Sequence, residues 1–258
     1  MHEEVHMNLS ANSKSIHISG AVLKWIAIIT MFMDHFGVAV MERFLRMNTW
    51  TLSMDRHSFY VMYRVCRSIG RLGFPLFCFL LVEGLFHTKS RGKYACRLLL
   101  FCFLSEFPFD LALFDTPFSM EHQNVFFTLL IGYLAIWGIH TLYEKSGLSP
   151  VFVIGTTGCI ALAYYTAEIL KTDYHGYGVL TIIAMYLIRK FSGSYLLSLG
   201  AGLLVLCVFN STEYPALAAL LPMVFYDGTR GKQMKYFFYL FYPVHLLLLY
   251  ACFVLFFT

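Results

Sequence analysis

Charged residues are scarce in this chain of 258 residues: they make up 13% of it, whereas hydrophobic residues make up 59%. A soluble globular domain carries roughly 25% charged residues. Most of this chain therefore cannot face water, which argues against a soluble fold. The formal net charge of +4 informs membrane topology and gives no reason to expect a nucleic-acid partner.

Several motifs of soluble enzymes are also missing. The sequence contains neither a glycine-rich phosphate loop nor a GxSxG elbow. Its seven cysteines form no CxxC pair and no Cys/His spacing of a metal site. We therefore expect the cysteines to be small buried hydrophobic residues, and we expect no metal cofactor.

Long apolar runs separated by short polar loops are what the chain does contain. Such runs predict an all-α, polytopic membrane bundle of about nine spans, within a range of roughly eight to ten. The polar stretch 1–19 has no cleavage site and predicts a retained tail before one membrane domain, 20–258. The predicted spans are 20–41, 66–86, 94–113, 124–143, 150–170, 174–190, 194–210, 213–226 and 235–257.

Basic residues in the loops predict the orientation of the bundle. The loops 87–97, 189–190 and 227–235 are basic, whereas the loops between them are acidic or nearly neutral. The positive-inside rule then places the N-terminus and Lys93 in the cytoplasm and the C-terminus outside. The stretch 42–67 disagrees, because it should lie outside yet is rich in arginine. It either contains further membrane-embedded structure or its arginines have a function.

Ionisable residues inside the apolar spans are the main functional signal. Each costs about 2.5–3.5 kcal/mol at a helix centre, so these side chains should face a polar interior. A structural hydrogen bond or ion pair between two helices would explain any one of these residues. The presence of the whole set at a similar depth in the membrane favours a functional cavity. The residues are Asp34, His35, Glu83, Glu106, Asp110 and His245, with Tyr242 one turn before His245.

Three arginines share one helical face at the start of the second span. Arg64, Arg67 and Arg71 have the spacing i, i+3 and i+7. One interpretation is a solvated rim, and the other is a site for an anionic group, because guanidinium groups suit phosphate and carboxylate.

Sequence blocks that cover most of the chain resemble the TraX family. They are LKWIAIITMFMDHFG (23–37), GRLGFPLFCFLLVEGLFHT (70–88), RLLLFCFLSEFPFDLALF (97–114), QNVFFTLLIGYLAIW (123–137) and KYFFYLFYPVHLLLL (235–249). The resemblance implies a bacterial inner-membrane protein, and the best-known members acetylate the N-terminal amine of conjugative pilin. The family is also similar to larger membrane acyltransferases that take acetyl groups from cytoplasmic acetyl-CoA.

An acyltransferase needs a base, a group that stabilises the oxyanion and a site for the donor. His35 is the first candidate base and His245 the second, because imidazole titrates near neutrality. Asp34, Glu106 or Asp110 would assist, although adjacent helical residues such as Asp34 and His35 point about 100° apart. Tyr242, Asn124 or Arg71 would stabilise the oxyanion.

Acetyl-CoA is anionic and is expected as donor and co-substrate. Its phosphates are predicted to bind Lys89, Arg91, Lys93 and Arg71. Alternative residues for the same role are Arg189, Lys190 and Lys232. The positive-inside rule alone would also explain the cations in the loops. Arg64 and Arg67, with Asn124 and Tyr242, would bind the acceptor, a peptide or small molecule. Two other functions stay open: a proton-coupled transporter and a non-catalytic factor for appendage assembly. Membrane lipid is a further expected partner, and the oligomeric state is not predicted.

Overall fold

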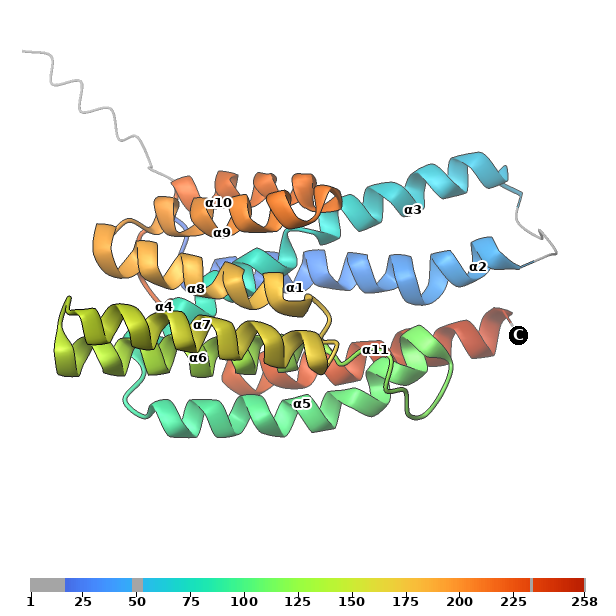
Figure 1. The fold of residues 1–258 in the computed structure, drawn as a ribbon. Helices are drawn as coiled ribbons and strands as arrows, with labels where there is room; N and C mark the ends of the chain where they lie inside the picture. The colour runs from blue at the N-terminus through green and yellow to red at the C-terminus, as the bar shows by residue number, and fades with distance from the viewer. Residues whose placement is uncertain (1–16, 48–52, 233, 258) are drawn as a thin grey trace, which may run out of the picture.

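The computed structural model describes residues 17–47, 53–232 and 234–257, and the predicted tail lies almost wholly outside these residues. Within them the protein is an all-helical bundle whose helices run roughly side by side (Figure 1). The elements are α1 (Gly20–Phe36), η1 (Gly37–Glu42), α2 (Arg43–Arg46), α3 (Arg56–Gly70), α4 (Gly73–His87), α5 (Arg91–Phe114), α6 (Val125–Ser146), α7 (Pro150–Ile169), α8 (His175–Ser192), α9 (Tyr195–Phe209), η2 (Ser211–Ala219), α10 (Leu220–Val224) and α11 (Lys235–Phe257).

Every predicted span coincides with helical structure, which confirms the all-α prediction. By length and composition, five helical stretches of the described chain are long and apolar enough to cross a membrane. They are Gly20–Arg46, Arg56–His87, Val125–Ser146, Pro150–Ile169 and Tyr236–Leu255. The number of crossings and the side on which the N-terminus lies stay predictions.

Polar residues at the loop ends define where several helices begin. Asp55, Ser90, Ser149 and Ser194 each accept a hydrogen bond from a backbone N–H in the first turn of α3, α5, α7 and α9. Such side chains satisfy donors that would otherwise be unpaired. Gly193 follows α8 in the left-handed region, with φ of 71°, where glycine carries no steric penalty.

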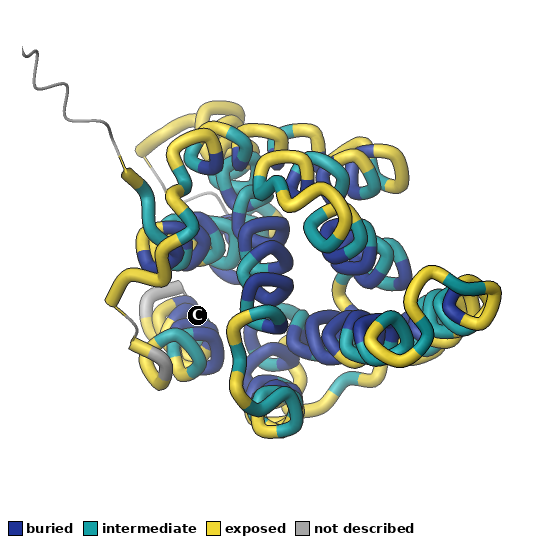
Figure 2. Tube along the Cα trace, turned by 90° about the vertical axis from the view of Figure 1, so that its left-hand side faces the viewer, coloured by how far each residue is buried: buried dark blue, intermediate teal, exposed yellow. Residues whose placement is uncertain are grey.

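Burial is concentrated on the helix faces that point into the bundle, while the outward faces expose apolar side chains (Figure 2). Leu23, Phe79 and Tyr133 are fully buried in the core, whereas Phe103 and Leu248 are more than 60% exposed. An apolar exterior over an equally apolar core is the pattern of a bundle surrounded by lipid.

The described residues of the arginine-rich stretch 42–67 are largely helical, which agrees with the first of the two interpretations offered for it, further helical structure. Its first part completes the first long helix as far as Arg46, and α3 begins at Arg56. The second helical stretch thus starts ten residues before the predicted boundary of 66. Arg56 and Arg64 are exposed on α3, whereas Arg67 is partly buried against α1.

Candidate functional site

His35 on α1 and His245 on α11 form a hydrogen-bonded pair. The Nδ1 atom of His35 lies 2.6 Å from the Nε2 atom of His245. The two rings are nearly parallel, with centroids 4.9 Å apart and an interplanar angle of 16°. The two bases that the sequence offered as alternatives therefore belong to one arrangement.

The hydrogen bonds of this pair determine where the protons lie when both rings are neutral. The Nδ1 atom of His245 is 2.6 Å from the carbonyl oxygen of Phe241, which can only accept, so this Nδ1 carries the hydrogen. The Nε2 atom of His245 is then an acceptor and receives the Nδ1–H of His35. The Nε2 atom of His35 keeps its lone pair, which makes it the available base.

His35 lies where two cavities meet. The larger cavity has a volume of about 570 Å³ and the smaller one of about 220 Å³. His35 lines both cavities, whereas His245 lines neither and is 3% exposed. The residues shared by the two linings are Asp34, His35, Asp173 and Tyr174. A reactive group at this junction is reachable from both cavities.

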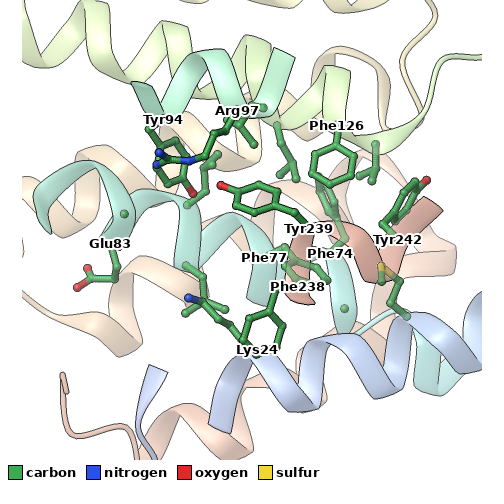
Figure 3. A pocket seen from close by; sticks show the side chains of 18 of the residues that line it. Lys24, Phe74, Phe77, Glu83, Tyr94, Arg97, Phe126, Phe238, Tyr239 and Tyr242 are labelled. Carbon is green, nitrogen blue, oxygen red and sulfur yellow. The ribbon is translucent and has the colours of Figure 1, made fainter. Parts of the chain in front are cut away.

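The larger cavity is aromatic in its interior and cationic at one end. Tyr242 lies at one end of the view in Figure 3, while Lys24 and Arg97 extend from opposite walls toward the other end. The basic residues of this lining are Lys24, Lys89, Lys93, Arg97 and Arg230. They come from α1, from the connection before α5, from α5 itself and from the segment before α11. Its size is that of an ordinary small-molecule site.

Other basic residues of the predicted donor site lie elsewhere. Arg91 forms a salt bridge of 3.3 Å with Glu144 on α6 and does not line the cavity. Arg71 lines the smaller cavity instead. The rival Arg189 is bonded to Glu83 at 2.7 Å, and Lys190 lies over the ring of Tyr143. Lys232 is exposed and lines neither cavity.

The lining of the smaller cavity includes six charged residues, four of which form two ion pairs. Arg67 lies 2.6 Å from the Asp34 carboxylate, and Arg71 lies 2.8 Å from the fully buried Glu213. Asp34 thus pairs with Arg67 and not with His35. This agrees with the angle of about 100° between the directions of adjacent helical residues. Arg64 is exposed and lines neither cavity, so the three arginines do not act as a set.

Gly70 provides the space that the Asp34–Arg67 pair occupies. A Cβ atom at this position would collide with the side chain of Asp34. Gly37 similarly faces Arg67, whose Cδ would lie 3.2 Å from an added Cβ. Gly37 also begins η1, a π-helical segment, and such segments occur frequently at functional sites.

Glu106, Asp110 and Asn124 lie outside both linings and hold the loop between α5 and α6. The side-chain amide of Asn124 donates to Glu106 and, at 2.8 Å, to the carbonyl oxygen of Cys102. Asp110 accepts a hydrogen bond of 2.8 Å from the backbone N–H of Ser119. These contacts are structural, and the catalytic role suggested for Glu106 and Asp110 stays an untested prediction.

Tyr242 is the best placed of the candidate oxyanion donors. It lines the larger cavity, and its ring lies edge-on to His35 with centroids 5.5 Å apart. Its hydroxyl is buried and has no hydrogen-bond partner within the described chain. That hydroxyl is therefore a donor that no residue of the described chain occupies.

Sequence reasoning missed several residues of the two linings. Lys24 is a lone cation in an apolar run and could have been flagged as such. Arg97 was considered only as the end of the basic loop offered for the phosphates, and Arg230 only as a loop charge. Asp173 and Glu213 stand in short polar loops, where an acidic residue carries no signal of its own.

The chain was compared with protein families, curated proteins and solved structures. The family described as "TraX protein" matches residues 19–252. The chain belongs to the TraX family. It is also 34% identical, over 261 residues, to the "Probable fimbrial assembly protein FimC, serogroup H1" of Dichelobacter nodosus, covering 92% of this chain and 96% of that protein. No solved structure matches the chain. The match confirms the resemblance that the sequence blocks suggested.

Proposed function

We propose that this TraX-family protein is a membrane acyltransferase that moves an acetyl group from acetyl-CoA to an amine or hydroxyl group. The observation that carries the proposal is the unprotonated Nε2 of His35 at the junction of two cavities, one of them with a cationic end. A donor entering from one side and an acceptor from the other could meet there without crossing paths.

The larger cavity would hold the donor. Its cationic end, built by Lys24, Lys89, Lys93, Arg97 and Arg230, suits the phosphates of acetyl-CoA. Lys89, Lys93, Arg97 and Arg230 lie in the stretches 87–97 and 227–235, whose positive charge predicts a cytoplasmic location, where acetyl-CoA is made. Lys24 lies at the start of α1, next to the tail that the predicted orientation places on the same side. The aromatic interior would surround the pantetheine arm, and the thioester would reach the level of His35 and Tyr242.

His35 would act as the general base. Its Nε2 takes the proton of the attacking group as the bond to the thioester carbon forms, and later returns a proton to the departing thiolate. His245 accepts a hydrogen bond from the imidazolium that forms on His35, and Phe241 holds His245 in the required tautomer. The hydroxyl of Tyr242 would donate to the oxyanion.

The acceptor would reach His35 from the smaller cavity. The default acceptor is the N-terminus of a pilin-like peptide, in line with the family and with the fimbrial relative. The expected location is the bacterial inner membrane, which the apolar helices and the family support.

Purified protein in lipid nanodiscs and radiolabelled acetyl-CoA test the proposal. We expect saturable donor binding and transfer of label to a short peptide with a free N-terminus. His35→Ala should retain donor binding and lose transfer. A well-folded protein that neither binds acetyl-CoA nor releases free coenzyme A from it would contradict the function.

A second function, a non-catalytic assembly factor, is favoured by the name of the fimbrial relative. Such a factor would support assembly without chemistry at His35. Fimbriae that assemble normally around a folded His35→Ala protein, with unmodified subunits in the wild type, would favour it over the acyltransferase.

A further inference from the structure

Asp173 is an ionisable residue at the centre of the site to which no role has yet been given. It lies in the loop between α7 and α8 and lines both cavities beside Asp34 and His35. Its carboxylate forms no hydrogen bond or salt bridge with any residue in 17–47, 53–232 or 234–257. It is thus accessible to a molecule in either cavity.

The other carboxylates of the smaller cavity are already paired. Asp34 is bonded to Arg67, and Glu213 to Arg71, at 2.6 and 2.8 Å. Glu42 lies 2.5 Å from Arg46 and accepts a hydrogen bond from a tyrosine hydroxyl. Asp173 is left as the carboxyl group of this cavity without an ion-pair partner in the described chain, so its ionised form favours a positively charged group at the junction.

An amine acceptor loses two protons during acyl transfer, whereas a hydroxyl loses one. At neutral pH the amine arrives as an ammonium group, since an α-amino group has a pKa of about 7.7–8.0. One proton must leave before nitrogen can attack, and a second leaves from the tetrahedral intermediate. His35 provides one base, so a second base in the site would allow the ammonium form, which predominates at neutral pH, to react as well.

We propose that Asp173 binds the ammonium group of the acceptor at the junction of the cavities and takes its first proton. This assignment rests on the acyltransferase function proposed above. The neutral amine then attacks the thioester carbon, and the C–N bond forms. His35 takes the second proton and passes it to the thiolate as the C–S bond breaks. The products are the amide, free coenzyme A and one proton, which Asp173 releases to water.

The surroundings of Asp173 suit a group that takes and releases a proton near neutrality. Desolvation by the protein that surrounds the cavities raises the pKa of Asp173 to about 7, although the residue is exposed to them. The Asp34 carboxylate acts in the same direction, while Arg71 and Arg67 oppose the shift. The backbone beside it is fixed, because Thr172 N donates to Ala167 O at 3.1 Å.

Other ionisable groups around Asp173 must be separated from it in any test. Those facing it from the packed elements are Asp34 and His35 on α1, Arg67 on α3, Arg71 after α3, and Glu213 in η2. Tyr174 and Tyr177 also line the smaller cavity, and Tyr242 lines the larger one. Substituting Asp173 alone leaves all of these groups in place. The ratio of the variant and wild-type kcat/KM values across the pH range therefore isolates the contribution of Asp173.

The test compares the pH dependence of acetyl transfer to alanyl-glycine amide in wild type and Asp173→Asn. Without the carboxylate, only amine that is already neutral in solution can react, which is about 3% of it at pH 6.5 for a pKa of about 8. With a pKa of about 7, about a quarter of Asp173 is ionised at pH 6.5, so we expect kcat/KM of the variant to be about 5- to 10-fold lower there and within about twofold of wild type at pH 9. A purely structural role predicts the same loss at both pH values, and that result would overturn the assignment.

Two further variants complete the experiment. Asp173→Glu keeps a carboxylate and should retain the wild-type shape of the profile; a profile like that of the asparagine variant would also overturn the assignment. This variant decides the question if Asp173→Asn does not fold. Glu121→Gln removes an exposed acid from another loop, and its pH profile should superimpose on that of the wild type. Wild-type protein that binds acetyl-CoA but transfers nothing to the amine refutes Asp173 as an ammonium site, whereas absence of donor binding refutes the acyltransferase function itself.

Discussion

Replacing His245 tests whether the histidine pair is a functional unit, because His245 lines neither cavity and can act only through His35. His245→Leu removes the acceptor for the Nδ1–H of His35 and keeps an apolar side chain in a buried position. His245→Gln keeps an acceptor, since the amide oxygen of glutamine can occupy nearly the place of the imidazole Nε2. The two variants therefore separate the hydrogen bond from packing.

The size of the effect follows from the charge that His35 gains during the reaction. A hydrogen bond to a charged group contributes about 1.5–3 kcal/mol, and each 1.36 kcal/mol is a factor of ten in rate. Loss of the bond to the imidazolium should lower kcat by about 10- to 150-fold in His245→Leu. His245→Gln should recover at least part of that loss.

Steady-state transfer from labelled acetyl-CoA, with donor affinity measured separately, checks the prediction. The donor Kd should stay near its wild-type value in both variants, because His245 is shielded from the larger cavity. A monodisperse size-exclusion peak establishes that each variant is folded. Wild-type kcat in His245→Leu, or an equal loss in the glutamine and leucine variants, would refute the hydrogen-bonding role.

Three other perturbations follow from the cavities and the fold. Lys93→Glu should weaken acetyl-CoA binding by about three- to tenfold, and this difference in affinity should shrink with added salt. Lys232→Glu, outside the cavity, should leave the affinity unchanged. Equal effects of the two substitutions would mean that both lysines serve only the membrane topology. Gly70→Ala should lower the free energy of unfolding, measured by thermal unfolding, by about 1–3 kcal/mol because its Cβ collides with Asp34. Gly200→Ala, with open space around it, should be neutral or stabilising. Equal melting temperatures of the two variants would disprove the steric explanation. Reporter fusions at Lys93 and at the C-terminal residue should report opposite sides of the membrane, and reporters on one side would disprove the predicted orientation.

The helices could be predicted from sequence because each apolar range is long enough to require hydrogen bonding within its own backbone in lipid. The start of α3 at Arg56 was not predicted, because frequent arginines lower the hydropathy of this helix and Gly70 is its one buried residue. Arg67 is compatible with helix there because it reaches Asp34 on α1.

The sequence predicted most of the ionisable residues of the site but not which of them contact one another. His35 and His245 stand out because imidazoles are costly in apolar spans. Their contact joins positions 210 residues apart and depends on how α1 packs on α11, which hydropathy does not encode. Asp173 illustrates the opposite case: an unremarkable loop acid becomes central only when the loop folds back to the junction of the cavities.

The most direct test of the central claim is turnover of His35→Ala per folded molecule, with labelled acetyl-CoA and a peptide acceptor. A general base contributes roughly 10²–10⁴-fold in rate, so turnover should fall by about that factor while donor binding persists. His57→Ala, at an exposed position on α3, serves as the matched control and should behave as wild type. A folded His35→Ala protein with wild-type turnover would contradict the assignment of His35 as the base of an acyl-transfer reaction.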